Sequence, residues 1–274
     1  MKLYKPQEDV EALRQAMTGK GTDETAIINI LVHRTSNQRQ IISKTYKGAF
    51  DRDLIEDLKS ELGNHFEDVM VGLMTPMPLY LAQALHTAIH GRHINILILI
   101  EILCTRDHSS MDNINKAYKD EYGKELTADL HTLPTIAICE FFIAMATKDR
   151  SDLIDDLQIA KYLSQNTNIL LEDQNNNETK FPKELNGFID TIYESMQSPS
   201  VFFAKALNRA VAGIGTDDST LIRLVVSRCD IDIGKIKEAY EKLYNESLEK
   251  AIRGDTSGDY MKALLTLIES STEE

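Results

Sequence analysis

Apolar residues recur along the chain at the three- and four-residue spacing of helices that bury one face. The first such segment carries Val10, Leu13 and Ala16 on one side. A capping residue, Asp23 or Thr22, precedes the next segment. In the first quarter the pattern predicts five short helices. They are 8–17, a capped segment that contains 26–31, a segment that Ser36 opens and that contains 41–46, and the segments 51–62 and 66–74, with Gly63 as a C-terminal cap before the last.

The chain repeats this pattern. A shift of 72 residues superposes the first quarter on similar residues further on, and a shift of 194 residues does so again without a gap. The larger shift pairs Leu13 with Leu207, Gly19 with Gly213, Gly21 with Gly215, Thr22 with Thr216 and Asp23 with Asp217. Because so small a unit cannot bury its apolar faces alone, the units must pack together. The sequence therefore predicts an all-α array of four repeats of about five short helices each.

Repeat 3 departs from this scheme because it is shorter than the others and its middle is polar and rich in Asn. We expect it to keep an early helix over 153–162 and a late one over 185–196, with a long loop between them. The predicted organisation is a short arm at 1–7, repeat 1 at 8–77, repeat 2 at 78–148, a degenerate repeat 3 at 149–198 and repeat 4 at 199–274.

In repeat 2 the β-branched run 94–100 has the propensity of a strand. Its alignment with 22–28 of repeat 1 predicts a fully buried helix instead.

The net charge of −13 narrows the choice of partners. A nucleic-acid partner is excluded, since it would require a basic face that displaces counterions. An anionic membrane should repel the protein as a whole, so any attraction has to come from a basic patch or a bound cation.

Three widely separated cysteines, Cys104, Cys139 and Cys229, lack the spacing of a metal site and indicate buried thiols in a reducing compartment. The start of the chain has no apolar signal segment. The longest apolar run, 94–104, is eleven residues long and too short to span a bilayer. We therefore expect a cytoplasmic protein that associates with membranes reversibly.

A glycine-rich connection in repeat 1 carries the candidate chemistry. Gly19 and Gly21 are spaced by one residue, which lets the backbone take positive φ and turn its carbonyls into one pocket. Calcium binds six to eight oxygens, and backbone carbonyls serve well. Backbone carbonyls carry no net charge, and the negative charge that a calcium site needs could come from Glu61, thirty-nine residues after Thr22.

Repeat 4 preserves this arrangement. Gly213 and Gly215 occupy the same places, and Asp255 again follows Thr216 by thirty-nine residues. In the alternative interpretation, the glycines only end a helix and the acids are solvated. Because both copies keep the same spacing between loop and carboxylate, two calcium sites are favoured over this alternative.

These loops make the chain resemble the annexin family, whose four five-helix repeats each carry a Gly-x-Gly-Thr loop and an acidic residue about forty positions on. The resemblance is strong over 8–148 and 199–270 and weak between. It implies no enzymatic activity, but calcium-dependent binding to anionic, phosphatidylserine-like phospholipid membranes, with a role in membrane organisation or trafficking. The calcium ligands that it implies are the carbonyls of Met17, Gly19 and Gly21 with the Glu61 carboxylate, and the carbonyls of Val211, Gly213 and Gly215 with Asp255.

The resemblance also implies a second, minor ion near Thr22 and Glu24. One carboxylate among neutral carbonyls should bind calcium weakly, at roughly 10⁻⁴–10⁻³ M. Lipid oxygens would fill the open coordination positions and raise the calcium affinity by linkage. At the loop tips, Lys20 would contact phosphate and Ile214 would sit among headgroups.

Two repeats depart from the family pattern. The loop of repeat 2 lacks the second glycine and the threonine, and Leu133 stands at the position of the acid, so no site is expected there. Repeat 3 has no matching loop. Leu81 and Ala84 replace an acidic pair that relatives carry beside a polar channel, which argues against ion conduction.

Two other classes of protein are alternatives to a membrane-binding annexin. The first is an annexin-like helical scaffold that acts mainly by binding proteins. The second is an enzyme, for which the chain offers no nucleophile with a base. His86, His90 and His93 have helical spacing, but they fall beside the altered loop of repeat 2 and are predicted to form a solvated helix end.

Overall fold

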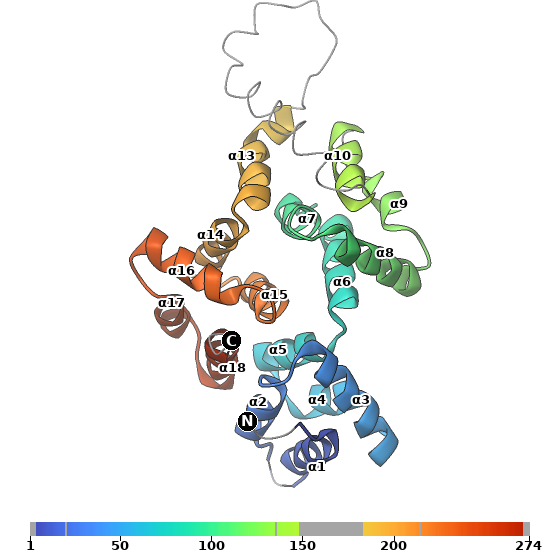
Figure 1. The fold of residues 1–274 in the computed structure, drawn as a ribbon, viewed down its shortest axis with the longest axis vertical. Helices are drawn as coiled ribbons and strands as arrows, with labels where there is room; N and C mark the ends of the chain where they lie inside the picture. The colour runs from blue at the N-terminus through green and yellow to red at the C-terminus, as the bar shows by residue number, and fades with distance from the viewer. Residues whose placement is uncertain (1–3, 20, 135, 148–182, 214, 271–274) are drawn as a thin grey trace, which may run out of the picture. The chain divides into compact units, whose positions relative to one another are not determined.

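The computed structural model describes residues 4–19, 21–134, 136–147, 183–213 and 215–270 (Figure 1). These residues form helices and their connections, without a strand among them, so the predicted all-α fold class is confirmed. Within the same ranges, no helix has both the length and the apolar character to cross a membrane.

The chain divides into two compact units, and the first of them joins the two ends of the sequence. Unit 1 comprises 1–77 and 203–274, and unit 2 comprises 78–202. The helices of unit 1 are α1 (Pro6–Ala16), α2 (Glu24–Leu31), α3 (Ser36–Phe50), α4 (Leu54–Glu61), α5 (Asn64–Met74), most of α14 (Pro199–Val211), α15 (Asp218–Arg228), α16 (Ile233–Tyr244), α17 (Leu248–Asp255) and α18 (Gly258–Ser270). Unit 2 holds α6 (Met77–His90), α7 (Ile96–Leu103), α8 (His108–Tyr122), α9 (Leu126–Leu130), α10 (Ile136–Thr147) and α13 (Lys183–Gln197).

Local sequence signals explain where the helices of repeat 1 begin. Pro6 occupies the first turn of α1, where its missing N–H costs nothing. Thr35 and Gln38 form a reciprocal capping box at the start of α3. The carboxylate of Asp53 accepts hydrogen bonds from the first turn of α4. The prediction for Gly63 is wrong: α4 ends in extended backbone, and Gly63, at φ −140°, is the N-cap of α5.

The core of unit 1 is built from helices far apart in the sequence. Helix α5 packs against α15 and α18, and α18 also packs against α2. The fully buried residues of these helices include Ile27, Val69, Leu224 and Leu264. Arg39 on α3, 1% exposed, reaches across the unit to Asp230 with its Nη1 3.2 Å from the carboxylate. The first and last repeats therefore share one core.

The apolar run of repeat 2 forms α7, as the alignment with repeat 1 predicts. Asn95 caps this helix and accepts a hydrogen bond from the amide of Ile98. The prediction of full burial is wrong, because Ile94 is 37% and Leu97 38% exposed. The first turn of α7 is partly exposed, whereas the consecutive residues Leu99–Leu103 are all buried, so the helix is enclosed only over its second half.

The late helix of repeat 3 is present as α13. The early helix predicted over 153–162 and most of the polar stretch after it lie outside the described residues. The repeat boundaries themselves stay predictions.

A buried carboxylate organises the interior of repeat 1. Asp57 on α4 is 5% exposed and accepts a hydrogen bond from the Tyr46 hydroxyl at 2.7 Å. Arg52 donates to it from Nε at 2.8 Å, and Arg14 from Nη1 at 3.3 Å. The hydrogen bond from Arg52 holds the pKa of Asp57 below its ordinary value. Burial raises this pKa, and the hydrogen bond from Tyr46 lowers it further.

Replacing Asp57 with Asn should lower the free energy of unfolding by about 1–2 kcal/mol at pH 7, since the partly exposed arginines can turn to water. The folded-state pKa lies below the unfolded value of about 3.9, so this stabilisation is fully present above about pH 5. It is lost as the pH falls through the folded-state pKa. Urea unfolding of both proteins at pH 7 and pH 3 would measure the difference. Glu56→Gln, an exposed change on the same helix, should have little effect at either pH.

Candidate calcium sites

The connection between α1 and α2 has a backbone that only glycine adopts without strain. Gly19 has φ +132° and Gly21 has φ +96°. The amide of Asp23 donates to the carbonyl of Ala16 at 2.9 Å and closes the loop over these glycines. The side chain of Asp23 then caps α2 by accepting from the amide of Ala26. The loop is therefore fixed at both ends, with its bend at the glycines.

The acid predicted for this site lies beside the loop. Oγ1 of Thr22 donates to Oε2 of Glu61 at 3.2 Å, across a separation of 39 residues. Glu61 is the last residue of α4 and is exposed. The structure thus brings the first and fourth interhelical connections of repeat 1 to one place, as the carboxylate spacing predicts.

Repeat 4 shows the same construction. The amide of Asp217 donates to the carbonyl of Ala210 at 2.9 Å, and Gly215 has φ +88°. Oγ1 of Thr216 donates to Oδ2 of Asp255 at 2.6 Å and to its backbone oxygen at 3.0 Å. Two loops 194 positions apart therefore hold a carboxylate through the same threonine contact.

The remaining predicted ligands are backbone carbonyls. The side chains of Met17 and Val211 are buried, at 5% and 9% exposure, so they anchor the loops, and only their backbone groups are available to an ion. In repeat 4 the carbonyl oxygen of Gly215 is turned toward Gly213. It lies 3.4 Å from the position that a Cβ atom on Gly213 would occupy. One carboxylate with several carbonyls is a donor set that suits calcium. The assignment of these oxygens as ligands stays a prediction.

The minor site and the lipid contacts are less well defined by the structure. The Thr22 hydroxyl is engaged with Glu61, and Glu24 is the first residue of α2. Lys20 and Ile214, the predicted lipid contacts, lie outside the described residues.

Negative charge gathers around the repeat 4 loop. Burial raises the pKa of Asp217, but hydrogen bonds from Thr220 and Ser219 more than offset this and lower it below its ordinary value. Burial and then the neighbouring carboxylate of Asp218 raise the pKa of the Tyr260 phenol, and the charge of Asp255 adds to the effect. Such a concentration of fixed negative charge attracts a divalent cation.

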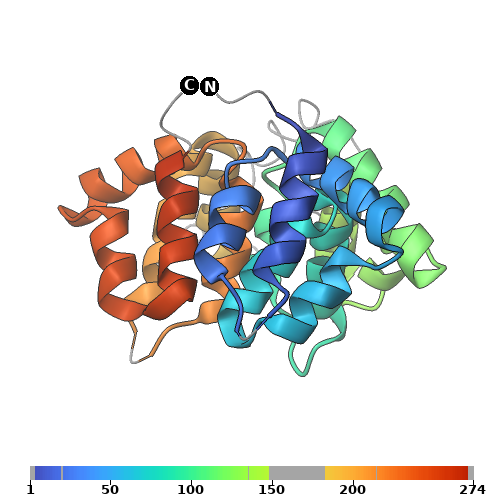
Figure 2. The same cartoon turned by 90° about the horizontal axis from the view of Figure 1, so that it is seen from below.

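Both loops belong to unit 1. In Figure 2 the connection after α1 and the connection after α14 lie at the same lower edge of the drawing. The segments that carry them also touch, since Nε2 of His65, just after Glu61, lies 3.2 Å from Oδ2 of Asp218. Two ions held in these loops would face the same side of the unit.

A hollow of about 540 Å³ lies next to the repeat 4 loop. Its lining includes Asp255, Val211 and the basic residues Lys250 and Arg253. A shift of 194 places Ala251, also in the lining, at the position of the buried Asp57 of repeat 1. The lining carries charge of both signs, since it also includes Glu246, which pairs with Lys250 at 3.0 Å.

The loop of repeat 2 keeps the backbone closure but loses the site. The amide of Asn95 donates to the carbonyl of Ala88 at 2.9 Å, as its counterparts in repeats 1 and 4 do. Gly91 is required here by space, because a Cβ would meet the carbonyl oxygen of Thr87 at 2.7 Å. Leu133, at the position of the acid, is 5% exposed and packs in the core. This loop therefore has no counterpart of the Glu61 carboxylate.

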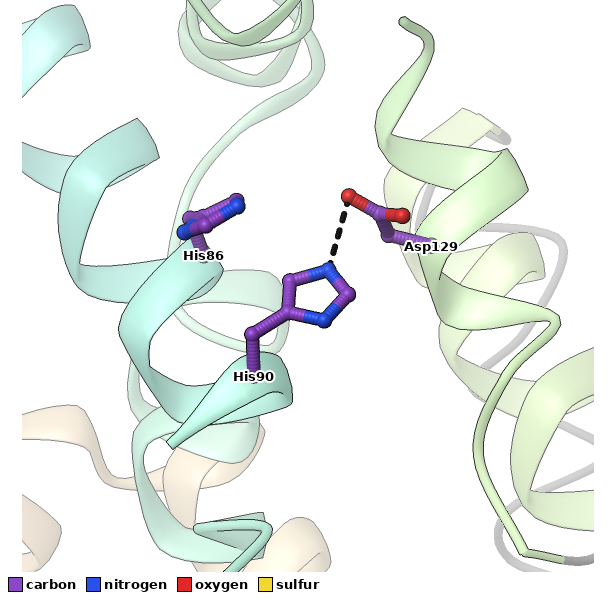
Figure 3. A group of neighbouring side chains, drawn as sticks. All are labelled: His86, His90 and Asp129. Carbon is purple, nitrogen blue, oxygen red and sulfur yellow. Dashed lines mark ion pairs between the residues drawn. The ribbon is translucent and has the colours of Figure 1, made fainter. Parts of the chain in front are cut away.

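The prediction of a solvated helix end holds for His90, the exposed last residue of α6, and for the exposed His93. It misses a contact with the interior, because His90 and the half-buried His86 both project from α6 toward the buried Asp129 (Figure 3). Burial, followed by the charge of His90, lowers the pKa of His86. Once the structure shows Arg14 paired with Asp57, the repeat reveals the relation, since a shift of 72 places His86 on Arg14 and Asp129 on Asp57.

Comparison with known proteins agrees with this architecture. The family model described as Annexin matches 8–73, 80–132 and 202–267. Annexin A4 of Mus musculus is 38% identical over 297 residues, which cover 95% of this chain and 93% of that protein. A point mutant of annexin A8 superposes with a TM-score of 0.84 at 32% identity, covering 98% of this chain and 96% of that one. The calcium-bound structure of annexin (Sm)1 gives 0.80 at 26% identity, covering 97% and 90%. The chain belongs to the annexin family.

Proposed function

We propose that this protein attaches reversibly to anionic phospholipid membranes through calcium ions held in the loops of repeats 1 and 4. Annexin membership supports calcium binding and calcium-dependent phospholipid binding in general. The observation that carries the proposal for this chain is the pair of threonine contacts, Thr22 to Glu61 and Thr216 to Asp255. These contacts support the proposal because each holds a carboxylate beside glycine-bent backbone, as a calcium-binding loop of this kind requires.

The bridging role follows from coordination and charge. Each predicted set supplies fewer oxygens than the six to eight that calcium takes, so phosphate or carboxyl oxygens of a lipid can complete it. The net charge of −13 opposes approach to an anionic surface, and the bound ions reverse the local field at the loops. Beside Asp255, Lys250 and Arg253 border a hollow with room for a headgroup.

Two loops on one side of unit 1 make the attachment bivalent. After one ion has bridged to lipid, the second loop meets the membrane at a high effective concentration, so weak sites can give firm attachment together. No catalytic step is part of the proposal.

Vesicle sedimentation across a calcium titration tests the function. We expect sedimentation with phosphatidylserine-containing vesicles at calcium concentrations below the roughly 10⁻⁴–10⁻³ M that the sites would need without lipid. Vesicles of phosphatidylcholine alone should leave the protein in the supernatant, and a chelator should release it from the anionic vesicles.

Equal sedimentation with both lipids, or sedimentation that persists in chelator, would contradict the proposal. An absence of sedimentation with either lipid at saturating calcium would favour the alternative, a helical scaffold that acts through protein partners.

A further inference from the structure

Three potential metal ligands converge in unit 2, away from the calcium loops. His86 and His90 stand one turn apart on α6, and Asp129 faces them from α9 (Figure 3). Nε2 of His90 lies 3.0 Å from Oδ2 of Asp129. One ligating atom from each of the three side chains lies within 4.8 Å of the other two.

Comparison with repeat 1 shows what changed at this place. In repeat 1, Nη1 of Arg14 lies 3.3 Å from Oδ2 of the buried Asp57. The residues 72 positions further on are His86 and Asp129. The same shift places His90 on Thr18. A guanidinium has no lone pair to donate, whereas a neutral imidazole has one. The exchange of one arginine and one threonine for two histidines therefore converts an ion pair into a set of metal donors.

The surrounding residues hold these donors in place. The ring of His86 stacks on Tyr122 at 3.9 Å between centroids, with 9° between the planes. Asp129 accepts a hydrogen bond from the Tyr118 hydroxyl, and its Oδ1 pairs with Lys124 at 2.7 Å. Metal ligands in proteins are oriented by partners of this kind. Lys124 therefore engages Oδ1, while Oδ2 accepts the hydrogen bond from Tyr118 and also lies beside Nε2 of His90. A carboxylate oxygen has two lone pairs, so Oδ2 can keep the Tyr118 hydrogen bond and still face the imidazoles.

We propose that His86, His90 and Asp129 bind a divalent transition-metal ion of the zinc class. Two imidazoles and one carboxylate, with a water in the fourth position, form a common tetrahedral zinc environment. Bonds of 2.0–2.1 Å would place the ligand atoms about 3.3 Å apart. The ligand atoms lie within 4.8 Å of one another, so the most distant of them must approach by up to about 1.5 Å. Calcium prefers an all-oxygen set and would not compete well for two nitrogen donors.

The ion can reach this position from solvent. His90 is exposed, while Asp129 beneath it is 3% exposed, so the cluster is open on one side. The entering ion replaces the direct contact between His90 and Asp129 and bridges α6 to α9. The site is independent of the calcium loops and of the proposed membrane attachment.

Titration calorimetry with Zn²⁺ on the full chain tests this inference. Glu61→Gln and Asp255→Asn are introduced first, so that the calcium loops lose their carboxylates. This background should bind one Zn²⁺ per chain. His86→Arg recreates the arrangement of Arg14 and Asp57 in repeat 1, which keeps the fold, and it should weaken Zn²⁺ binding by at least about tenfold.

His108→Arg is the matched control. His108 lies 3.8 Å from Asp112 on the surface of α8, so it is also a histidine beside a carboxylate but has no third ligand among the groups found in the described residues. Its replacement should leave Zn²⁺ binding unchanged. As a second readout, Zn²⁺ should raise the Tm of the background and not that of His86→Arg. Binding of equal strength in the His86→Arg chain, or an equal loss in the His108→Arg chain, would overturn the proposal.

Discussion

A chain carrying both Glu61→Gln and Asp255→Asn should no longer sediment with anionic vesicles at calcium concentrations that bind the unmodified protein completely. Each substitution removes the one charged donor of a predicted site. The amide oxygen that replaces it can still accept the hydrogen bond from Thr22 or Thr216, so the loops should keep their shape. The loss would then report on calcium rather than on folding.

The single variants separate the two loops. Each should retain binding through the other loop but forfeit the gain from bivalent attachment, which is about 10²- to 10⁴-fold for well-matched linked sites. The calcium needed for half-maximal sedimentation should therefore rise steeply in each single variant, by at least about tenfold. If either single variant behaves like the unmodified protein, that loop does not take part in attachment.

Glu56→Gln with Glu238→Gln serves as the control for charge. Both glutamates are exposed, pair with lysines on their own helices, and alter the net charge by the same amount as the loop substitutions. This control should sediment normally. Full binding by the loop double variant would show that Glu61 and Asp255 are not the ligands.

Arg39→Ala should lower the free energy of unfolding by about 3 kcal/mol, the largest effect that we expect from a change outside the loops. Nε of Arg39 donates to the carbonyl of Leu31 at 2.9 Å, and its side chain fills space between α3 and the end of α15. Truncation leaves a cavity and a buried carbonyl without its donor. Asp230, at 38% side-chain exposure, can turn to water and adds little to the cost.

Arg39→Met distinguishes packing from charge. The repeat supplies this residue itself, since the position equivalent to Arg39 in repeat 2 is the buried Met111. Methionine fills most of the volume, so this variant should lose only about 1 kcal/mol for the hydrogen bonds. Urea unfolding followed by circular dichroism measures both. Equal losses in the two variants would show that the ion pair, and not the packing, stabilises this contact.

The fold could be predicted largely because the chain repeats. A single apolar run such as that of α7 has the propensity of a strand, and the alignment with repeat 1 identified it as a helix. The errors arose where a residue's role depends on its neighbours in space. Gly63 has the residue type of a helix end, but the chain turns there in extended backbone and uses it to start α5. The exposure of the first turn of α7 is likewise set by which helices pack against it.

The juxtaposition of each glycine loop with its acid was predictable because glycines, a threonine and an acid recur with one spacing. The histidine cluster was not found because no motif links His86 and His90 to Asp129. Their relation appears only when the buried carboxylate of repeat 1 is known to be paired with Arg14. A chemical change at one partner of a buried pair is visible in the sequence only after the pair itself has been seen.

The joining of both chain ends in unit 1 imposes an order on synthesis. Arg39 and Asp230 are 191 residues apart, and at translation rates of 5–20 residues per second this separation takes roughly 10–40 s to cross. During that interval repeat 1 has left the ribosome without the helices that cover its apolar face. Contacts of such long range are also slow to form. Unit 1, which carries both glycine loops, is therefore the last to be completed, and a nascent chain needs protection from aggregation until α18 emerges.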